Sequence, residues 1–117
     1  GKYNGIVVGT GNKVEDYGVG FYTKYGDGGV DIAPIADLYK TEVWELGKFL
    51  EVDSRIIEAK PTDGLWDDNR TDEDQLGASY SQLEEAMESG TGPATEVLEK
   101  FNTMNKHKMQ PIPTFKL

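Results

Sequence analysis

The 117 residues contain no cysteine and one histidine, and acidic side chains outnumber basic ones by 21 to 12. Without cysteine there can be no disulfide framework, thiol nucleophile or thiolate metal site, and the redox compartment is left open. With His107 as the sole histidine, a multi-histidine metal site and a triad that needs a second such base are excluded. These absences remove several common classes of enzyme site.

Other absences restrict the partners and the location. The formal net charge of -9 argues against a surface for duplex nucleic acid, which needs clustered Lys and Arg. No apolar run approaches the ~20 residues that span a bilayer, and no basic and apolar leader precedes a cleavage site. We therefore expect one domain, residues 1–117, of a soluble cytoplasmic protein with neither nucleic acid nor membrane as a partner.

The pattern near the start predicts a strand. Ile6, Val7 and Val8 form a short β-branched run that ends at Gly9, as in a parallel strand buried on both faces. Other candidate strands, 21–25 and 30–32, are short and weak. Most of a parallel sheet would have to come from elsewhere, so the start is typical of a cut through a larger domain.

The rest of the chain predicts loops and helices. A glycine-rich loop over 9–29 precedes a helix that Asp37 can cap, and a brief helix over 55–60 stops at Pro61. Residues 62–74 are acidic and nearly aperiodic, which is typical of a mobile lid or a solvated loop. A capping box at 81–84 starts a helix that Gly90 can end, another helix opens at 92–93, and the tail turns basic at 105–108.

Two patterns could carry chemistry, and each has an ordinary structural alternative. Lys40 would occupy the third position of the helix begun at Asp37, where the helix dipole attracts anions, but a lone lysine is more often simply solvated. Glu15 and Asp16 follow the turn after the first strand, where a carboxylate can share Mg²⁺ with substrate phosphates. The alternative there is a solvated carboxylate at a helix start.

Two familiar motifs fail on inspection. The third glycine of a dinucleotide-binding fingerprint is replaced by Val14. A calcium loop beginning at Asp67 would need glycine where Asp72 stands and glutamate where Ala78 stands. Neither a dinucleotide fingerprint nor an EF-hand is therefore predicted.

The order of the motifs along the chain is more informative than any one of them. It resembles the ammonia-dependent NAD synthetases over nearly the whole sequence. The matching segments are Val7–Asp16, Thr23–Ile32, Asp37–Thr41, Lys60–Trp66, Thr71–Gly77 and Asn105–Lys108. The resemblance implies the C-terminal part of an α/β, Rossmann-like ATP pyrophosphatase domain with a parallel sheet, mostly helical in this portion.

The resemblance also implies a reaction. In this family the nicotinate carboxylate of deamido-NAD attacks the α-phosphate of ATP, and ammonia then displaces AMP from the acyl adenylate to give NAD. Such chemistry needs Mg²⁺ and lysines to neutralise phosphate charge, and a lid that keeps water off the adenylate. The expected ligands are thus ATP, Mg²⁺, deamido-NAD and ammonia, and family members are homodimers.

Site residues follow from the resemblance by position. Glu15 corresponds to the Mg²⁺ ligand, Lys40 is expected to act in catalysis, and Asp27 is expected to assist ammonia. The remaining implied contacts are with ATP, through Thr10, Lys40 and Thr62, and with deamido-NAD, through Lys24, Asp31, His107 and Lys108.

One family motif is absent from these residues. The family's glycine-rich loop for the ATP pyrophosphate, Ser-Gly-Gly-x-Asp-Ser, does not occur here, so we expect it upstream and expect this chain alone to be inactive. Two alternatives remain: a non-catalytic piece that only dimerises or binds part of a nucleotide, and another ATP pyrophosphatase such as a GMP synthetase. A GMP synthetase would not account for the amino-acid sequence of residues 24–31.

Overall fold

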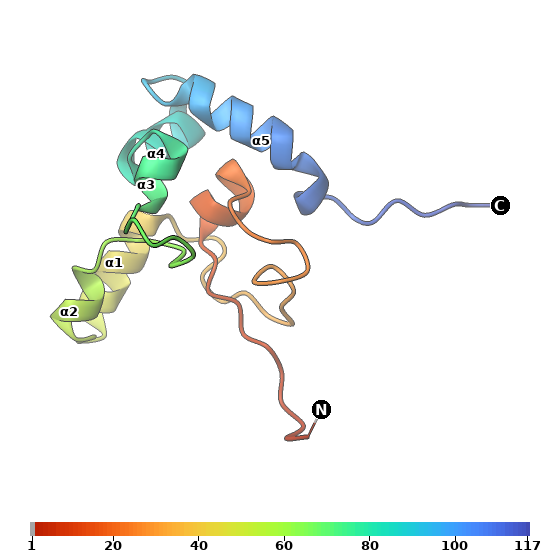
Figure 1. Cartoon of the computed structure of the whole chain (residues 1–117), viewed down its shortest axis with the longest axis horizontal. Coiled ribbons are helices and arrows are strands. Elements are labelled where there is room, and N and C mark those ends of the chain that lie inside the picture. Colours follow the sequence, from red (N-terminus) through yellow and green to blue (C-terminus); the bar gives the residue numbers. More distant parts are fainter. Residues whose placement is uncertain (1) are drawn as a thin grey trace.

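A computed structural model describes residues 2–117 as a set of short helices joined by long loops (Figure 1). One is a π-helix, η1, and the others are α-helices. Their bounds are Val14–Val19 for η1, Lys40–Phe49 for α1, Ser54–Ile57 for α2, Asp72–Leu76 for α3, Tyr80–Ser89 for α4 and Thr95–Met109 for α5. No described helix is both long and apolar enough to cross a membrane.

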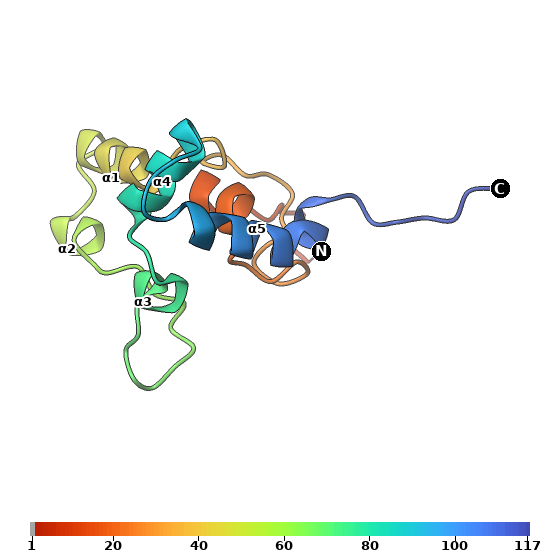
Figure 2. The same cartoon turned by 90° about the horizontal axis from the view of Figure 1, so that it is seen from above.

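The core forms where η1 packs against α4 and α5, while α1 contacts α2 and α4. Viewed from above, η1 lies between α4 and α5 (Figure 2). Val14 and Val19 are fully buried five residues apart, a spacing that suits the i→i+5 hydrogen bonds of a π-helix. The 9–29 segment, predicted mainly as a loop, therefore contains the central helix of the structure. A search for α-helical spacing misses it, because the buried residues are five apart.

Gly20 ends η1 and allows it to approach α5. Its φ of 66° is left-handed, and a Cβ added there would lie 2.4 Å from the Cβ of Asn105. Two amides on α5 secure the contact: Asn105 donates to the Val19 carbonyl at 2.9 Å, and Asn102 donates to the Gly18 carbonyl at 2.9 Å. A larger residue at position 20 would push the two elements apart.

The predicted parallel sheet is not present in the described residues. Residues 6–8 are extended, but their ladder is reduced to one parallel bridge between Val8 and Ile32. Ile6, Val7 and Val8 are 64%, 56% and 53% exposed, so the expected burial on both faces is wrong for this chain. The candidate strand 21–25 is a loop with turns. The β-branched pattern predicted a strand, but only the bridge at Val8 forms, because a buried parallel strand requires neighbouring strands.

The predicted helices are present, with different starts. Asp37 does not cap α1: it is exposed and pairs with Lys13 at 3.4 Å, and the helix begins at Lys40 after the N-cap Tyr39. The backbone N–H of Tyr39 donates to the Glu42 carboxylate at 2.8 Å, which secures that start. Lys40 is therefore the first residue of α1 rather than the third position of a helix begun at Asp37.

Helices α2, α4 and α5 show similar shifts. Asp53 caps α2, which covers Ser54–Ile57 rather than 55–60. The capping box of α4 uses Ser79 and Gln82 instead of residues 81–84, and Gly90 ends the helix as predicted. Helix α5 starts at Thr95 and carries the basic cluster in its last turn, where cations suit the helix dipole.

The acidic segment 62–74 is divided between a loop and a helix. Thr71 caps α3 by accepting from the backbone N–H of Asp74 at 3.1 Å, so the acidic residues 72–74 form the first turn of α3. Negative charge is favourable at that end of a helix. The loop proper covers residues 58–71 and closes where the Asp72 N–H donates to the Pro61 carbonyl at 2.9 Å.

Candidate functional site

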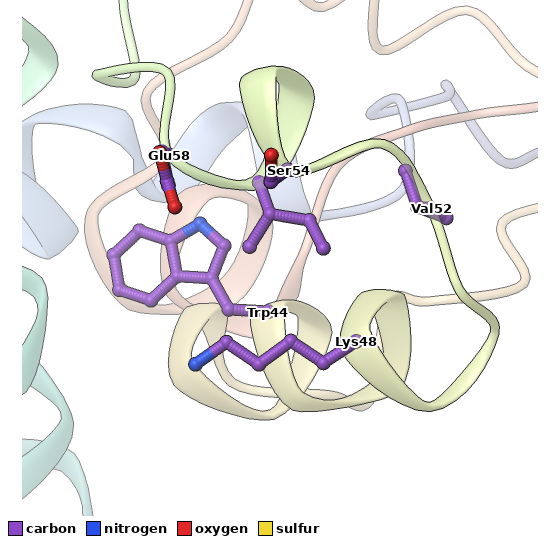
Figure 3. Close-up of a pocket in the computed structure, with 6 residues that line it drawn as sticks. Trp44, Lys48, Val52, Ser54 and Glu58 are labelled. Atoms are coloured by element: carbon purple, nitrogen blue, oxygen red, sulfur yellow. The ribbon is translucent and has the colours of Figure 1, made fainter.

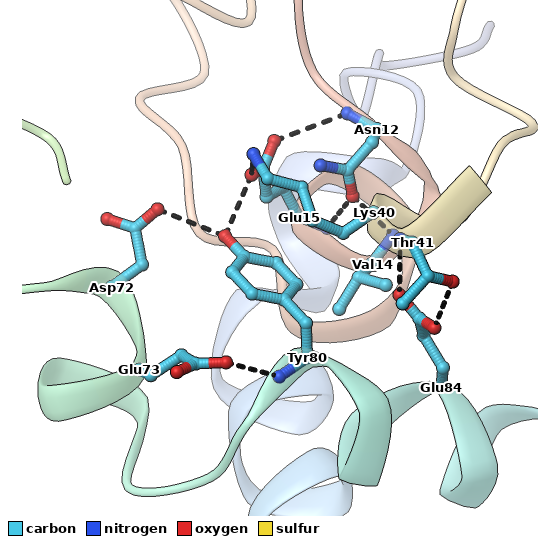
Figure 4. Close-up of polar contacts among 9 residues, drawn as sticks. All are labelled: Asn12, Val14, Glu15, Lys40, Thr41, Asp72, Glu73, Tyr80 and Glu84. Atoms are coloured by element: carbon cyan, nitrogen blue, oxygen red, sulfur yellow. Dashed lines mark hydrogen bonds and ion pairs between the residues drawn. The ribbon is translucent and has the colours of Figure 1, made fainter. Parts of the chain in front are cut away.

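Glu15 lies in the first turn of η1, and Asn12 sets that turn. The buried Asn12 side chain accepts from the backbone N–H groups of Val14 at 3.0 Å and Glu15 at 3.2 Å. The Glu15 carboxylate in turn accepts from the Asn12 N–H at 3.3 Å (Figure 4). These reciprocal bonds satisfy amide groups that a helix start leaves open, and they aim the carboxylate toward α1.

Lys40 meets Glu15 from the start of α1. Its Nζ donates to Glu15 Oε1 at 3.1 Å, and the two side chains are only 18% and 16% exposed. Glu84 on α4 holds this end of the helix by accepting from the backbone N–H of Thr41 at 3.1 Å and from its hydroxyl at 2.7 Å (Figure 4). A lysine at a helix start is favoured when an anion lies close to it. In this structure that anion is the Glu15 carboxylate.

Tyr80 completes the arrangement from the first residue of α4. Its hydroxyl lies 2.8 Å from Glu15 Oε1 and 3.0 Å from Asp72 Oδ2 (Figure 4). Burial and the two carboxylates raise the pKa of Tyr80, so the phenol keeps its proton. Burial also raises the pKa of Asp72, whose Oδ1 has no hydrogen-bond partner among the described residues. We call Glu15, Lys40, Asp72 and Tyr80 the carboxylate cluster.

The cluster faces a cavity of about 370 Å³. Three residues that the resemblance assigns to ATP line it together with the proposed metal ligand and the proposed ammonia residue. The lining consists of Thr10, Glu15, Phe21, Asp27, Lys40, Pro61, Thr62, Asp63 and Asp72. Five of the implied site residues, distant in sequence, thus share one cavity.

A second group of implied residues lies where loop 20–29 meets the end of α5. Lys108 donates to the carbonyls of Gly20 at 2.9 Å and Tyr22 at 2.7 Å, and Lys24 donates to the carbonyl of His107 at 2.9 Å. We call Lys24, Lys108 and these carbonyl contacts the lysine clasp. A cavity of about 520 Å³ beside it is lined by Lys24, His107, Lys108 and two tyrosines of the loop.

Asp27 and Asp31 occupy different places. Asp27 accepts from the Thr23 N–H at 2.7 Å and also faces a smaller cavity of about 190 Å³ next to Asp16. Burial and the nearby carboxylates of Glu15 and Asp27 raise the pKa of Asp16 to about 6. Asp31 is exposed and accepts from the Val7 N–H at 2.7 Å, so it holds the extended segment near the start of the chain.

Four buried residues of the site were not assigned a role from the sequence: Asn12, Asp72, Tyr80 and Glu84. Asn12 stands before an acidic pair, where an N-cap signal could have been recognised. Tyr80 and Glu84 lie four residues apart and so share one face of α4, but Glu15, which Tyr80 contacts, and Thr41, which Glu84 contacts, are 65 and 43 residues away. No local pattern identifies such partners.

A larger cavity of about 560 Å³ lies between α1 and α2 (Figure 3). Trp44, Lys48, Val52, Ser54, Ile57 and Glu58 line it. None of the implied site residues is among them. The ring of Trp44 also packs edge-on against Tyr80, with centroids 6.2 Å apart, so this helix pair supports the carboxylate cluster from behind.

Comparison with known proteins decides the family. The NAD synthase family profile matches residues 1–115. The chain belongs to the NAD synthase family. An NH(3)-dependent NAD(+) synthetase of Archaeoglobus fulgidus is 56% identical over 84 residues, covering 72% of this chain and 33% of the relative. One from Alkaliphilus oremlandii is 45% identical over 114 residues, covering 94% and 45%. The chain thus spans a third to just under half of these relatives.

Solved structures agree with this assignment. The structure of an NMN synthetase from Francisella tularensis superposes with a TM-score of 0.85 at 37% identity, covering 99% of this chain and 49% of that one. An NH3-dependent NAD synthetase from Campylobacter jejuni gives 0.65 at 26% identity, covering 97% and 46%. The chain therefore has the arrangement of about half of an NAD synthase family member, which favours this family over the alternative of a GMP synthetase.

Proposed function

We propose that this chain forms part of an ammonia-dependent NAD synthetase and contributes to ATP-dependent amidation of deamido-NAD through an acyl adenylate. The supporting observation is the shared cavity of the carboxylate cluster, which joins Glu15, Lys40, Thr10 and Thr62. The family membership and the names of the relatives point to the same reaction.

The residues present fit a Mg²⁺ ion held jointly with a nucleotide. Among residues 2–117 no group of three or more His, Asp or Glu side chains is placed to hold a metal. Mg²⁺ in nucleotide enzymes needs only one or two carboxylates, because phosphates and water supply the other oxygens. Glu15 would be the protein ligand, and the ion would neutralise charge on the α-phosphate.

Lys40 would supply the positive charge that this chain itself contributes. It already lies 3.1 Å from the Glu15 carboxylate, with little solvent around it. A cation held in a partly dry cavity stabilises developing phosphate charge more strongly than one in water. The hydroxyls of Thr10 and Thr62 at the cavity wall would orient the nucleotide.

The lysine clasp would bind the second substrate. The chain carries a net charge of -9, yet Lys24, His107 and Lys108 gather beside one cavity. Tyr22 and Tyr25 line the same cavity and offer ring faces to a flat aromatic group. This combination suits the phosphate and ring of a nicotinate nucleotide.

We also propose that the protein is a homodimer in the cytoplasm.

A second candidate is amidation of nicotinate mononucleotide, as the name of the Francisella protein suggests. The observation in its favour is the higher TM-score and identity with that NMN synthetase than with the Campylobacter NAD synthetase. The two candidates share the chemistry at the carboxylate cluster. They differ in whether an adenylate half of the dinucleotide must be accommodated.

One assay tests both candidates on the full-length protein that contains this sequence. It is incubated with ATP, Mg²⁺, ¹⁵N-ammonium and either deamido-NAD or nicotinate mononucleotide, and products are analysed by mass spectrometry. We expect ¹⁵N in the amide of NAD, with AMP and pyrophosphate formed in equal amounts. Preference for the mononucleotide would support the second candidate, and ¹⁵N in neither product would contradict both.

A further inference from the structure

Tyr80 has one phenolic hydrogen and two carboxylates within reach. Its oxygen lies 2.8 Å from Glu15 and 3.0 Å from Asp72, while the phenol can donate to only one of them at a time. Asp72 is 7% exposed, and its other carboxylate oxygen is buried with no hydrogen-bond partner within residues 2–117. Buried polar atoms without hydrogen-bond partners are few in folded proteins, so this oxygen of Asp72 needs a structural explanation.

We propose that Tyr80 is a positioning residue whose hydroxyl holds the Glu15 carboxylate for a divalent cation and joins it to Asp72 at the closed end of loop 58–71. The identity of Glu15 as the cation ligand rests on the proposed function. The positioning role does not depend on which nicotinate nucleotide is the substrate.

The ring and the hydroxyl of Tyr80 have different surroundings. The Tyr80 ring is 1% exposed and lies in the core with Leu83 and Val14, and Trp44 packs against its edge. The hydroxyl alone reaches the two carboxylates. Replacement by phenylalanine keeps the ring and removes only the oxygen, so its effect on cation binding reports the hydroxyl contacts.

Asp72 connects this hydroxyl to the wall of the nucleotide cavity. Its N–H closes the loop on Pro61, and the neighbouring Thr62 hydroxyl donates to the Arg70 carbonyl at 3.0 Å. The base of the loop and the Glu15 carboxylate are therefore linked through two side chains, Asp72 and Tyr80. Groups that hold a metal ligand by hydrogen bonds typically change metal affinity by about 10- to 100-fold when removed.

The test is calorimetric titration of the full-length protein with Mn²⁺ in the presence of a non-hydrolysable ATP analogue. We expect Tyr80→Phe to raise the Mn²⁺ Kd about tenfold. Tyr3→Phe is the matched control, because Tyr3 is 86% exposed and the chemical change is the same. A melting curve for each variant checks that the core is intact.

A second comparison separates positioning from a merely structural role. In a Glu15→Gln background, Tyr80→Phe should cause no further change in the Mn²⁺ Kd, since its target is already gone. A Kd for Tyr80→Phe within twofold of wild type, or an equal loss in both backgrounds, would overturn the inference. Because the readout is cation binding, a wild-type protein that binds Mn²⁺ yet forms no NAD would contradict the proposed function alone.

Discussion

The carboxylate cluster and the lysine clasp are built in opposite ways. In the cluster, side chains from η1, α1, α3 and α4 bond to one another, and Glu15, Asp72 and Lys40 are largely removed from water. In the clasp, two lysines bond to backbone carbonyls of a loop and a helix end. The cluster is thus organised by charge pairing, and the clasp by main-chain contacts.

Because the two regions are held by different contacts, substitutions in them should have different consequences. A lost charge in the cluster leaves another charge unpaired in a partly dry cavity, so chemistry and local electrostatics should suffer first. A lost lysine in the clasp releases carbonyls and loosens loop 20–29 from α5, so stability and substrate binding should change together. Substitutions in each region can test this contrast.

The largest effect is expected from Lys40→Met in the cluster. The change removes the ammonium group that contacts Glu15 and, by the proposed function, a phosphate partner. We expect kcat/KM for ATP to fall by about 10²–10³-fold, as when one preorganised charged donor is lost. Steady-state kinetics on the full-length protein measure this.

Lys48→Met is the control for that change, since Lys48 is an exposed lysine on the same helix. It should leave kcat/KM within about twofold of wild type. A Lys40→Met protein that melts normally and keeps its activity would show that the cluster does not serve the reaction.

Lys108→Met should disrupt the lysine clasp. We expect its effect to be smaller than that of Lys40→Met and to fall chiefly on the free energy of unfolding. Two charged hydrogen bonds to carbonyls are lost, and a free energy of unfolding lower by about 1.5–3 kcal/mol is expected. Urea unfolding at constant m-value measures it. The neighbouring exposed Lys106→Met should change it by less than about 0.5 kcal/mol, and equal effects of the two would contradict the clasp.

Asp72→Asn should have the smallest effect and a distinct pH dependence. Because burial raises the Asp72 pKa in the folded state above its ordinary 3.8, the folded protein holds a proton that the unfolded chain releases. The wild type therefore loses stability as pH rises through the folded pKa, and the neutral amide does not. Melting temperatures should favour Asp72→Asn at neutral pH and converge below pH 3.8, where the carboxyl is protonated in both the folded and the unfolded state. A difference independent of pH would contradict this.

Local patterns predicted α1, α2, α4, α5 and the stop at Gly90, because caps and periodicity act over a few residues, but the acidic segment predicted as a loop contains the start of α3. The start of α1 is fixed by two contacts rather than by Asp37: the local bond from the Tyr39 N–H to Glu42 and the long-range bond from the Thr41 N–H to Glu84. The π-helix escaped prediction because its buried valines are five residues apart. The sequence pattern predicted a buried strand at residues 6–8, whereas the structure forms one bridge there and leaves the side chains exposed, because burial depends on neighbouring strands.

Some of the site residues that the resemblance implies lie together in the structure, and others do not. The sequence motifs shared with the family identified Glu15, Lys40, Thr10 and Thr62 as candidate site residues, and all four line one cavity in the structure. Asp31 instead bonds to the Val7 N–H, a contact no local pattern reveals. The long-range bonds of Tyr80 and Glu84 likewise depend on the packing of α4, which single-sequence reasoning does not provide.

The most direct test of the central claim is Mn²⁺ binding by Glu15→Gln in the full-length protein with a non-hydrolysable ATP analogue. Glu45→Gln, an exposed glutamate on α1, is the matched control. The account predicts that Glu15→Gln raises the Mn²⁺ Kd measured with the nucleotide analogue by more than Tyr80→Phe does, while Glu45→Gln keeps the wild-type Kd. An unchanged Kd in Glu15→Gln would show that the cation and nucleotide are held elsewhere.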